Sequence, residues 1–189
     1  VHSLETFAKV IEINLIGTFN VIRLAAARMV EAEPNEAGER GVIINTASVA
    51  GLGGGGGPQA YSAAKAAVIN LTETTANELA AHLIRVNAIC PGIIFTPLMH
   101  RGDEADAETV MSELQPLPKR GEGSDIAGAA LWLAGSDAAF VTGTSIVVDG
   151  GISSAGTRLY GRLGGTQNLD RVVGIAHGTT GQAASVRRL

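Results

Sequence analysis

A tyrosine and a lysine in the middle of the sequence have the spacing of a proton-transfer site. Tyr61 and Lys65 are four residues apart in an alanine-rich segment, 59–81, that we predict to be helical. Residues at i and i+4 lie on one face of a helix, so the lysine ammonium can lie beside the phenol. A phenol is almost fully protonated at neutral pH, and a nearby ammonium favours its ionised form. The pair therefore predicts a general acid–base site.

A serine adds a third group to this candidate site. Ser48 follows residues 42–45, a β-branched run with the profile of a strand buried on both faces. Open α/β sheets place their active sites at the carboxyl ends of strands, so this hydroxyl could bind a substrate oxygen. A simpler interpretation stays open, because a tyrosine and a lysine at this spacing often form an ordinary surface pair.

The elements that must position these residues alternate between helix and strand. We predict strands over 42–45, 85–89 and 144–148, and helices over 3–32, 59–81, 104–115 and 126–134, the last capped by Asp125. Gly17 lies inside the first helix, where it costs about 1 kcal/mol relative to alanine, which suggests a packing or functional reason. The alternation predicts an α/β fold with a parallel sheet covered on both faces.

Composition bounds the class of protein. The chain has 189 residues, about one domain, and its net charge of −4 with 4% aromatic residues argues against a nucleic-acid surface. The single cysteine, Cys90, excludes a disulfide framework and suits a cytoplasmic location. The histidines show no pair at metal-binding spacing, so we expect no metal site. No uninterrupted apolar run approaches about 18 residues, so we expect no membrane span.

Charge divides the chain after Gly151. Residues 152–189 carry +4 and show no sustained hydrophobic period, whereas residues 1–151 carry −8. We therefore predict one folded domain over 1–151 and a basic, glycine-containing tail over 152–189 that is poorly ordered.

Five segments in chain order carry a family resemblance over residues 3–151. They are residues 13–17 around Asn14, 41–48 ending in Ser48, 61–65 from Tyr61 to Lys65, 84–92 followed by Thr96, and 141–143 with 148–151. In this order and spacing they resemble the motifs of the short-chain dehydrogenase/reductase family. The resemblance implies a Rossmann-like, doubly wound parallel sheet and an NAD(P)-dependent oxidoreductase that interconverts a secondary alcohol and a ketone.

The resemblance also implies a role for each motif residue. Tyr61 would be the general acid/base, Lys65 would favour its ionised form and bind the nicotinamide ribose, and Ser48 would orient the substrate oxygen. Asn14 would hold a water that connects Lys65 to solvent. The remaining cofactor contacts implied are Pro91, Gly92, Ile94 and Thr96. The cofactor would be NAD or NADP, and these residues do not distinguish the two.

The sequence departs from the family pattern at its start. The family's first β-α-β units, with the glycine-rich turn that binds the pyrophosphate, are not among these 189 residues, and we expect them to lie before residue 1. We therefore expect an N-terminally truncated fold, and we expect these 189 residues alone to bind a nicotinamide cofactor weakly or not at all. The alternative reading is a non-catalytic or cofactor-incompetent fragment of the same fold that serves oligomerisation or binding. Epimerase or dehydratase chemistry is a third possibility, which relatives with the same tyrosine and lysine perform.

Residues 11–50 look most like the type-2 3-hydroxyacyl-CoA and hydroxysteroid dehydrogenases, which implies a small-molecule substrate with a hydrophobic scaffold. Leu98, Met99, Met111 and Leu114 suggest an apolar wall for its pocket. By the same resemblance, the helices at 3–32 and 59–81 would pair with those of a second copy in a homodimer or homotetramer.

Overall fold

The computed structural model describes residues 3–100, 102–117 and 119–154. Most of the predicted tail, from residue 155 onward, lies outside the described residues. The described part contains the three strands and the four longer helices that the sequence predicts.

The three strands form one parallel sheet in the order β1-β2-β3. The strands are β1 (Gly41–Thr46), β2 (Ile84–Pro91) and β3 (Ser145–Val148). β1 pairs with β2 from Gly41↔Ile84 to Thr46↔Ile89, and β2 pairs with β3 from Ala88↔Ser145 to Pro91↔Val148. Because the strands are parallel, their carboxyl ends lie along one edge of the sheet, as the sequence predicted.

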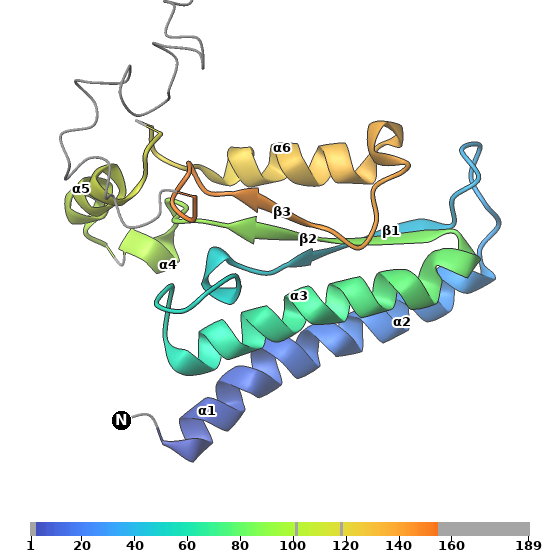
Figure 1. The fold of residues 1–189 in the computed structure, drawn as a ribbon, viewed down its shortest axis with the longest axis horizontal. Coiled ribbons are helices and arrows are strands. Elements are labelled where there is room, and N and C mark those ends of the chain that lie inside the picture. The colour runs from blue at the N-terminus through green and yellow to red at the C-terminus, as the bar shows by residue number, and fades with distance from the viewer. Residues whose placement is uncertain (1–2, 101, 118, 155–189) are drawn as a thin grey trace, which may run out of the picture. The chain divides into compact units, whose positions relative to one another are not determined.

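Helices cover both faces of this sheet (Figure 1). α2 and α3 lie on one face and α6 lies on the other, while α4 and α5 lie beyond the carboxyl ends of the strands. The helices are α1 (Leu4–Ile11), α2 (Gly17–Glu31), α3 (Gln59–Leu79), α4 (Pro97–His100), α5 (Glu104–Leu114) and α6 (Gly123–Ala134). The short turns η2 (Val49–Gly51), η3 (Ala80–His82) and η4 (Ser136–Ala138) complete the connections. This arrangement confirms the predicted Rossmann-like α/β fold.

The central strand β2 is the most deeply buried element. Every residue from Ile84 to Cys90 is buried, so apolar side chains of β2 contact helices on both faces. On one face Val86 packs with Ile22 of α2, and on the other Ile89 packs with Leu133 of α6. The prediction that residues 42–45 are buried on both faces is wrong for β1, where residues 42 and 44 are half-buried. The reason is that β1 has only β2 as a neighbour among the described strands.

The predicted helix over 3–32 is continuous but not regular. Ser3 caps it, as expected, by accepting a hydrogen bond from the Thr6 backbone N–H at 3.1 Å. A π-helical segment, Glu12–Ile16, separates α1 from α2, and Gly17 is the first residue after it. A π turn inserts one extra residue into the helix and commonly occurs at functional sites. A Cβ at Gly17 would meet only the Glu12 carbonyl oxygen, at 3.7 Å, so no close neighbour requires the glycine.

The predicted cap of α6 needs a correction. The N-cap residue is Glu122, and Asp125 is the third residue of the helix. The Asp125 carboxylate accepts a hydrogen bond from the Glu122 backbone N–H at 2.8 Å. The carboxylate therefore still satisfies a backbone N–H at this helix end, but from inside the first turn, as in a capping box.

The helix from Leu4 to Glu31 is long and apolar enough, by length and composition alone, to cross a membrane. The absence of long uninterrupted apolar runs did not anticipate this, because the polar residues are spread thinly along the helix. Core helices of folded domains meet the same criterion. In this structure only 6% of the apolar window is buried, although Ile22, Ala26 and Met29 pack in an apolar cluster with the sheet.

Candidate active site

Ser48 is held at the carboxyl end of β1. It lies two residues after Thr46 in an extended conformation and caps the short turn η2. Its Oγ accepts a hydrogen bond from the Ala50 backbone N–H at 3.1 Å. Since that bond uses a lone pair, the hydroxyl proton remains available for another acceptor. Ser48 therefore has the geometry to donate a hydrogen bond to a substrate oxygen.

The Tyr61–Lys65 pair lies in the first turns of α3. Lys65 Nζ is 5.6 Å from the centroid of the Tyr61 ring, within the range of a cation–π contact. The same Nζ donates a hydrogen bond to the backbone oxygen of Thr46 at 2.8 Å. The lysine therefore joins α3 to the end of β1, and its ammonium is fixed beside the tyrosine.

Partial burial lowers the pKa of the Lys65 ammonium from its ordinary value, and the nearby Cys90 thiol opposes this effect. Burial raises the pKa of Cys90, while a hydrogen bond from the Ser48 backbone and the charge of Lys65 act in the opposite direction. Burial penalises the charged form of each group, which explains both signs. Lys65 can therefore lose a proton more readily than a fully exposed lysine.

A glycine that the sequence analysis missed brings these groups together. A Cβ at Gly51 would lie 2.6 Å from the Lys65 backbone carbon and 2.7 Å from the Ala66 nitrogen. Only a residue without a side chain lets η2 approach the backbone of α3 this closely. Because Ser48 caps η2, this contact sets the position of its hydroxyl relative to Tyr61 and Lys65. The available signal was a glycine shortly after a strand end, separated by one residue from the run of glycines at 53–57.

Asn14 and Lys65 line one groove, of about 500 Å³, between the long N-terminal helix and β1. Asn14 lies in the π-helical segment, and its Nδ2 donates to the Val10 backbone oxygen at 3.1 Å. The groove also contacts Gly17, Asn45 and Thr46. The structure thus places the predicted asparagine and lysine on a common space wide enough for water.

The predicted cofactor-contact segment begins where β2 ends. Pro91 is the last residue of β2, and the Gly92 N–H donates to the Val148 backbone oxygen at 3.0 Å. A Cβ at Gly92 would lie 2.6 Å from the Cβ of Asp149, so the glycine permits close contact with the segment after β3. The Thr96 backbone oxygen accepts hydrogen bonds from the backbone N–H groups of Met99 and His100, the last two residues of α4. Thr96 therefore also has the turn-forming role that its sequence position allows.

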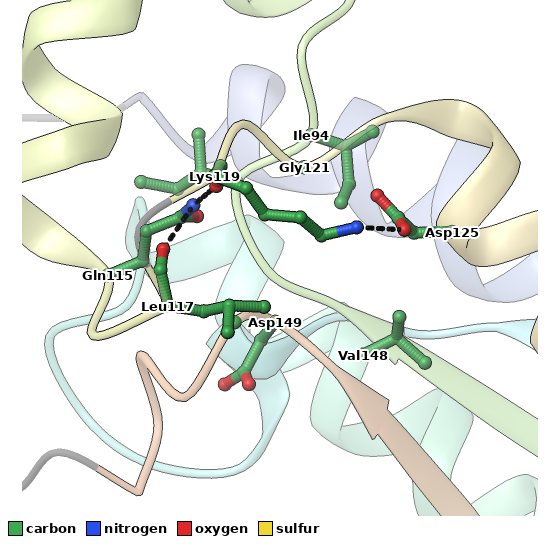
Figure 2. Close-up of a pocket in the computed structure, with 10 residues that line it drawn as sticks. Ile94, Gln115, Leu117, Lys119, Gly121, Asp125, Val148 and Asp149 are labelled. Carbon is green, nitrogen blue, oxygen red and sulfur yellow. Dashed lines mark hydrogen bonds and ion pairs between the residues drawn. The ribbon is translucent and has the colours of Figure 1, made fainter.

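Ile94 lines a second cavity, of about 190 Å³, which Figure 2 shows. This cavity lies between the strand ends and the start of α6, and Ser48, Tyr61 and Lys65 do not line it. Lys119 Nζ reaches across it to Asp125 Oδ1 at 2.6 Å. Gln115 Nε2 donates to the backbone oxygens of Leu117 and Lys119 on the same wall. The side chain of Ile94 is thus not in the groove that Lys65 lines.

The predicted apolar substrate wall stays a prediction. Met111 is 1% exposed, Met99 is half-buried and Leu114 is 48% exposed. Leu114 is the last residue of α5, where its side chain turns toward solvent. The side chain of Leu98 lies outside the described residues.

Comparison with known proteins agrees with this geometry. Residues 2–153 match the family described as enoyl-(acyl carrier protein) reductase. The chain is 48% identical over 127 residues to 3-hydroxyacyl-CoA dehydrogenase type-2 of Drosophila melanogaster, covering 67% of this chain and 49% of that protein. It is 44% identical over 151 residues to the Homo sapiens protein of the same name, covering 80% and 57%.

A solved structure shares the fold as well. 4-Hydroxyisoleucine dehydrogenase complexed with NADH superposes with a TM-score of 0.70 at 35% identity, covering 80% of this chain and 61% of that one. The chain therefore spans about half the length of the curated relatives it matches. On the family match, these identities and the shared fold, the chain belongs to the short-chain dehydrogenase/reductase family.

Proposed function

We propose that the chain carries the catalytic residues of an NAD(P)-dependent oxidoreductase that interconverts a secondary alcohol and a ketone. One observation carries this proposal: Lys65 is bonded to the Thr46 backbone oxygen and lies beside the Tyr61 ring at the strand end that Ser48 follows. Because the Thr46 backbone oxygen carries no net charge, the Lys65 ammonium has no carboxylate partner there, and its positive charge favours the ionised form of the tyrosine.

Each residue then has a defined task. Tyr61 Oη gives a proton to the ketone oxygen during reduction and takes the hydroxyl proton during alcohol oxidation. Ser48 donates its hydroxyl proton to the same substrate oxygen, because its own Oγ is already held by the Ala50 N–H. Lys65 stabilises the ionised tyrosine, and Asn14 binds water in the groove beside Lys65.

The residues present fit part of a nicotinamide cofactor. Lys65 Nζ uses one of its three N–H groups on Thr46, which leaves one for the ribose hydroxyls, together with Tyr61, and one for water. The backbone of Pro91, Gly92, Ile94 and Thr96 follows the end of β2 and would hold the nicotinamide side. When bound, NAD or NADP supplies or accepts the hydride.

The substrate class follows from the relatives. Two of them are named 3-hydroxyacyl-CoA dehydrogenases. We infer a hydrophobic substrate such as a 3-hydroxyacyl-CoA or a hydroxysteroid. We also propose a cytoplasmic enzyme that forms a homodimer or homotetramer through its N-terminal helix and α3, with no nucleic acid or membrane as partner. The exposed Phe19 and Leu24 on α2 support such contacts.

The test compares Tyr61→Phe with a substitution of a neighbouring residue. Both variants are made in the protein encoded by the longest open reading frame that contains these residues. Ser62→Ala is the control, because Ser62 Oγ is buried with no hydrogen-bond partner among the described residues. NAD- and NADP-linked oxidation of 3-hydroxybutyryl-CoA and of a hydroxysteroid is followed at 340 nm. We expect Tyr61→Phe to lower kcat by at least about 100-fold, the usual contribution of general acid–base catalysis, and Ser62→Ala to retain activity. Equal activity in the two variants would refute the mechanism, and an inactive wild type would favour a non-catalytic member of the fold.

A further inference from the structure

The groove beside Lys65 contains a second amide, Asn45, to which the family resemblance assigns no role although it lies within the motif at 41–48. Asn45 lies on β1, is 6% exposed, and lines the groove together with Asn14 and Lys65. Its Nδ2 donates a hydrogen bond to Thr72 Oγ1 of α3 at 2.9 Å. Within the described part of the chain, no residue donates a hydrogen bond to Asn45 Oδ1. Asn45 therefore brings an unused acceptor to the groove.

Thr72 determines which end of this amide faces the groove. Thr72 is fully buried, and its hydroxyl donates its single proton to the Val68 backbone oxygen at 2.8 Å. The hydroxyl can then only accept from Asn45, so the NH₂ group must point toward Thr72. The amide oxygen is consequently the end left for the groove.

The groove has the complementary donors and enough room for water. Lys65 Nζ spends one N–H on the Thr46 oxygen, and its two other N–H groups have no protein acceptor among the described residues. Asn14 donates through Nδ2 to Val10, which leaves its own amide oxygen as an acceptor. A volume of about 500 Å³ accommodates several waters, each of which occupies about 30 Å³ in the liquid. Two amide oxygens and an ammonium can thus hold a short chain of water.

We propose that Asn45 is a positioning residue for proton transfer: its Oδ1, oriented by Thr72, accepts from water bound at Lys65 and helps link that ammonium to solvent. The proposal rests on the proposed function, because this link is needed only if Tyr61 exchanges a proton with a substrate. For each alcohol oxidised, one proton leaves Tyr61 Oη and one proton reaches solvent. Lys65 ends each cycle in the protonation state in which it began.

The groups that surround Lys65 set the sign of the expected effects. Tyr61 on α3 and Cys90 on β2 are the titratable groups that face it. The other groove-lining residues, from the π segment, α2 and β1, carry no charge. Replacing the Asn45 amide with leucine removes a carbonyl dipole that favours the ammonium, so the pKa of Lys65 falls. Replacing it with the isosteric aspartate adds a negative charge, so that pKa rises.

The test measures the pKa of Lys65 in the full chain without cofactor, from the pH dependence of its acetylation read by mass spectrometry. We expect Asn45→Leu and Asn45→Asp to shift this pKa in opposite directions. We expect Thr72→Val to shift it like Asn45→Leu, because the amide is then free to rotate, and Thr72→Ser to retain the wild-type value. Asn77→Ala is the matched control, since Asn77 is exposed on the same helix and bonds only to the Glu73 backbone oxygen. Circular dichroism verifies that each variant is folded.

The second measurement is the enzymatic activity of the protein encoded by the longest open reading frame that contains these residues. The loss of one hydrogen bond that orients the relay lowers kcat of Asn45→Leu about tenfold with KM little changed, and Thr72→Ser retains the wild-type rate. A pKa of Lys65 that is the same in wild type, Asn45→Leu and Asn45→Asp would overturn the inference, as would a wild-type value in Thr72→Val. Full activity in Tyr61→Phe would instead refute the proposed function and leave the pKa result intact, so the two failures are distinguishable.

Discussion

Arg85 is the side chain whose removal should disturb this fold most. It lies at the start of β2, and its Nε donates to Glu39 Oε1 at 2.6 Å, with both side chains largely buried. Its Nη1 also donates to the Leu133 backbone oxygen near the end of α6, at 2.8 Å. The guanidinium therefore joins the loop before β1, the central strand and the helix on the far face of the sheet.

The predicted magnitude follows from what Arg85→Met leaves behind. Glu39 keeps 15% of its side chain exposed, so its unpaired carboxylate falls at the lower end of the 3–5 kcal/mol typical of a broken buried pair, about 3 kcal/mol. The orphaned Leu133 carbonyl adds about 1 kcal/mol. We expect Arg85→Met to lower the free energy of unfolding by about 4 kcal/mol, a large part of the stability of a small domain.

Urea denaturation followed by circular dichroism measures this loss. With a slope of about 2 kcal/mol per molar urea, the midpoint falls by about 2 M. Arg28→Met is the matched control, because Arg28 and its partner Glu31 are both exposed, and it should change stability by less than about 0.5 kcal/mol. The double variant with Glu39→Leu should recover part of the loss, because neither charge is then left alone. A single-variant loss below about 1 kcal/mol, or a double variant whose loss equals the sum of the two single losses, would refute the reasoning.

Three further perturbations test the close contacts and charges of the site. Gly92→Ala should lower stability by about 1–3 kcal/mol in thermal unfolding, because the new methyl overlaps the backbone after β3, whereas Gly53→Ala meets no atom within 4 Å and should be neutral. Lys65 binds fewer protons when folded, so stability should rise with pH from its lowered pKa up to about 10.5, and Lys65→Met should abolish the rise. The titration of Cys90 has the opposite effect and lowers stability as the pH rises above about 9.0. The protein with Lys65 and the Lys65→Met variant are therefore compared by urea titration in a Cys90→Ala background. Gly17→Ala should raise the unfolding free energy by about 0.5–1 kcal/mol, and a loss would show that the π turn requires glycine.

The strands and the tyrosine–lysine pair could be read from the sequence because their signals are local. The β-branched run at 42–45 falls inside β1, and the run at 85–89 falls inside β2. The spacing of Tyr61 and Lys65 needed only the regular geometry of one helix to become a contact. The distinction between an edge strand and a central strand was not readable, because it depends on how many neighbours each strand has.

The π-helical segment was not predictable for a different reason. Residues 4–31 keep an apolar period throughout, and one inserted residue shifts the register without interrupting it. Gly17 directly follows this segment, and the low helix propensity of glycine was the only indication of the irregularity in the sequence. Asn14 was identified through its motif, while its position on a groove with Lys65 became visible only in three dimensions.

Backbone atoms decide how this site is assembled, and this limits what side-chain motifs can show. Lys65 is fixed by the Thr46 carbonyl oxygen, and Ser48 is placed by the contact of Gly51 with the backbone of α3. In both contacts the partner is a backbone atom, so no side-chain motif in the sequence reveals them. A substitution of Thr46 that retains the strand should therefore leave the lysine in place, whereas any side chain at Gly51 must separate η2 from α3. The catalytic motif thus depends on one glycine outside it as strongly as on its own residues.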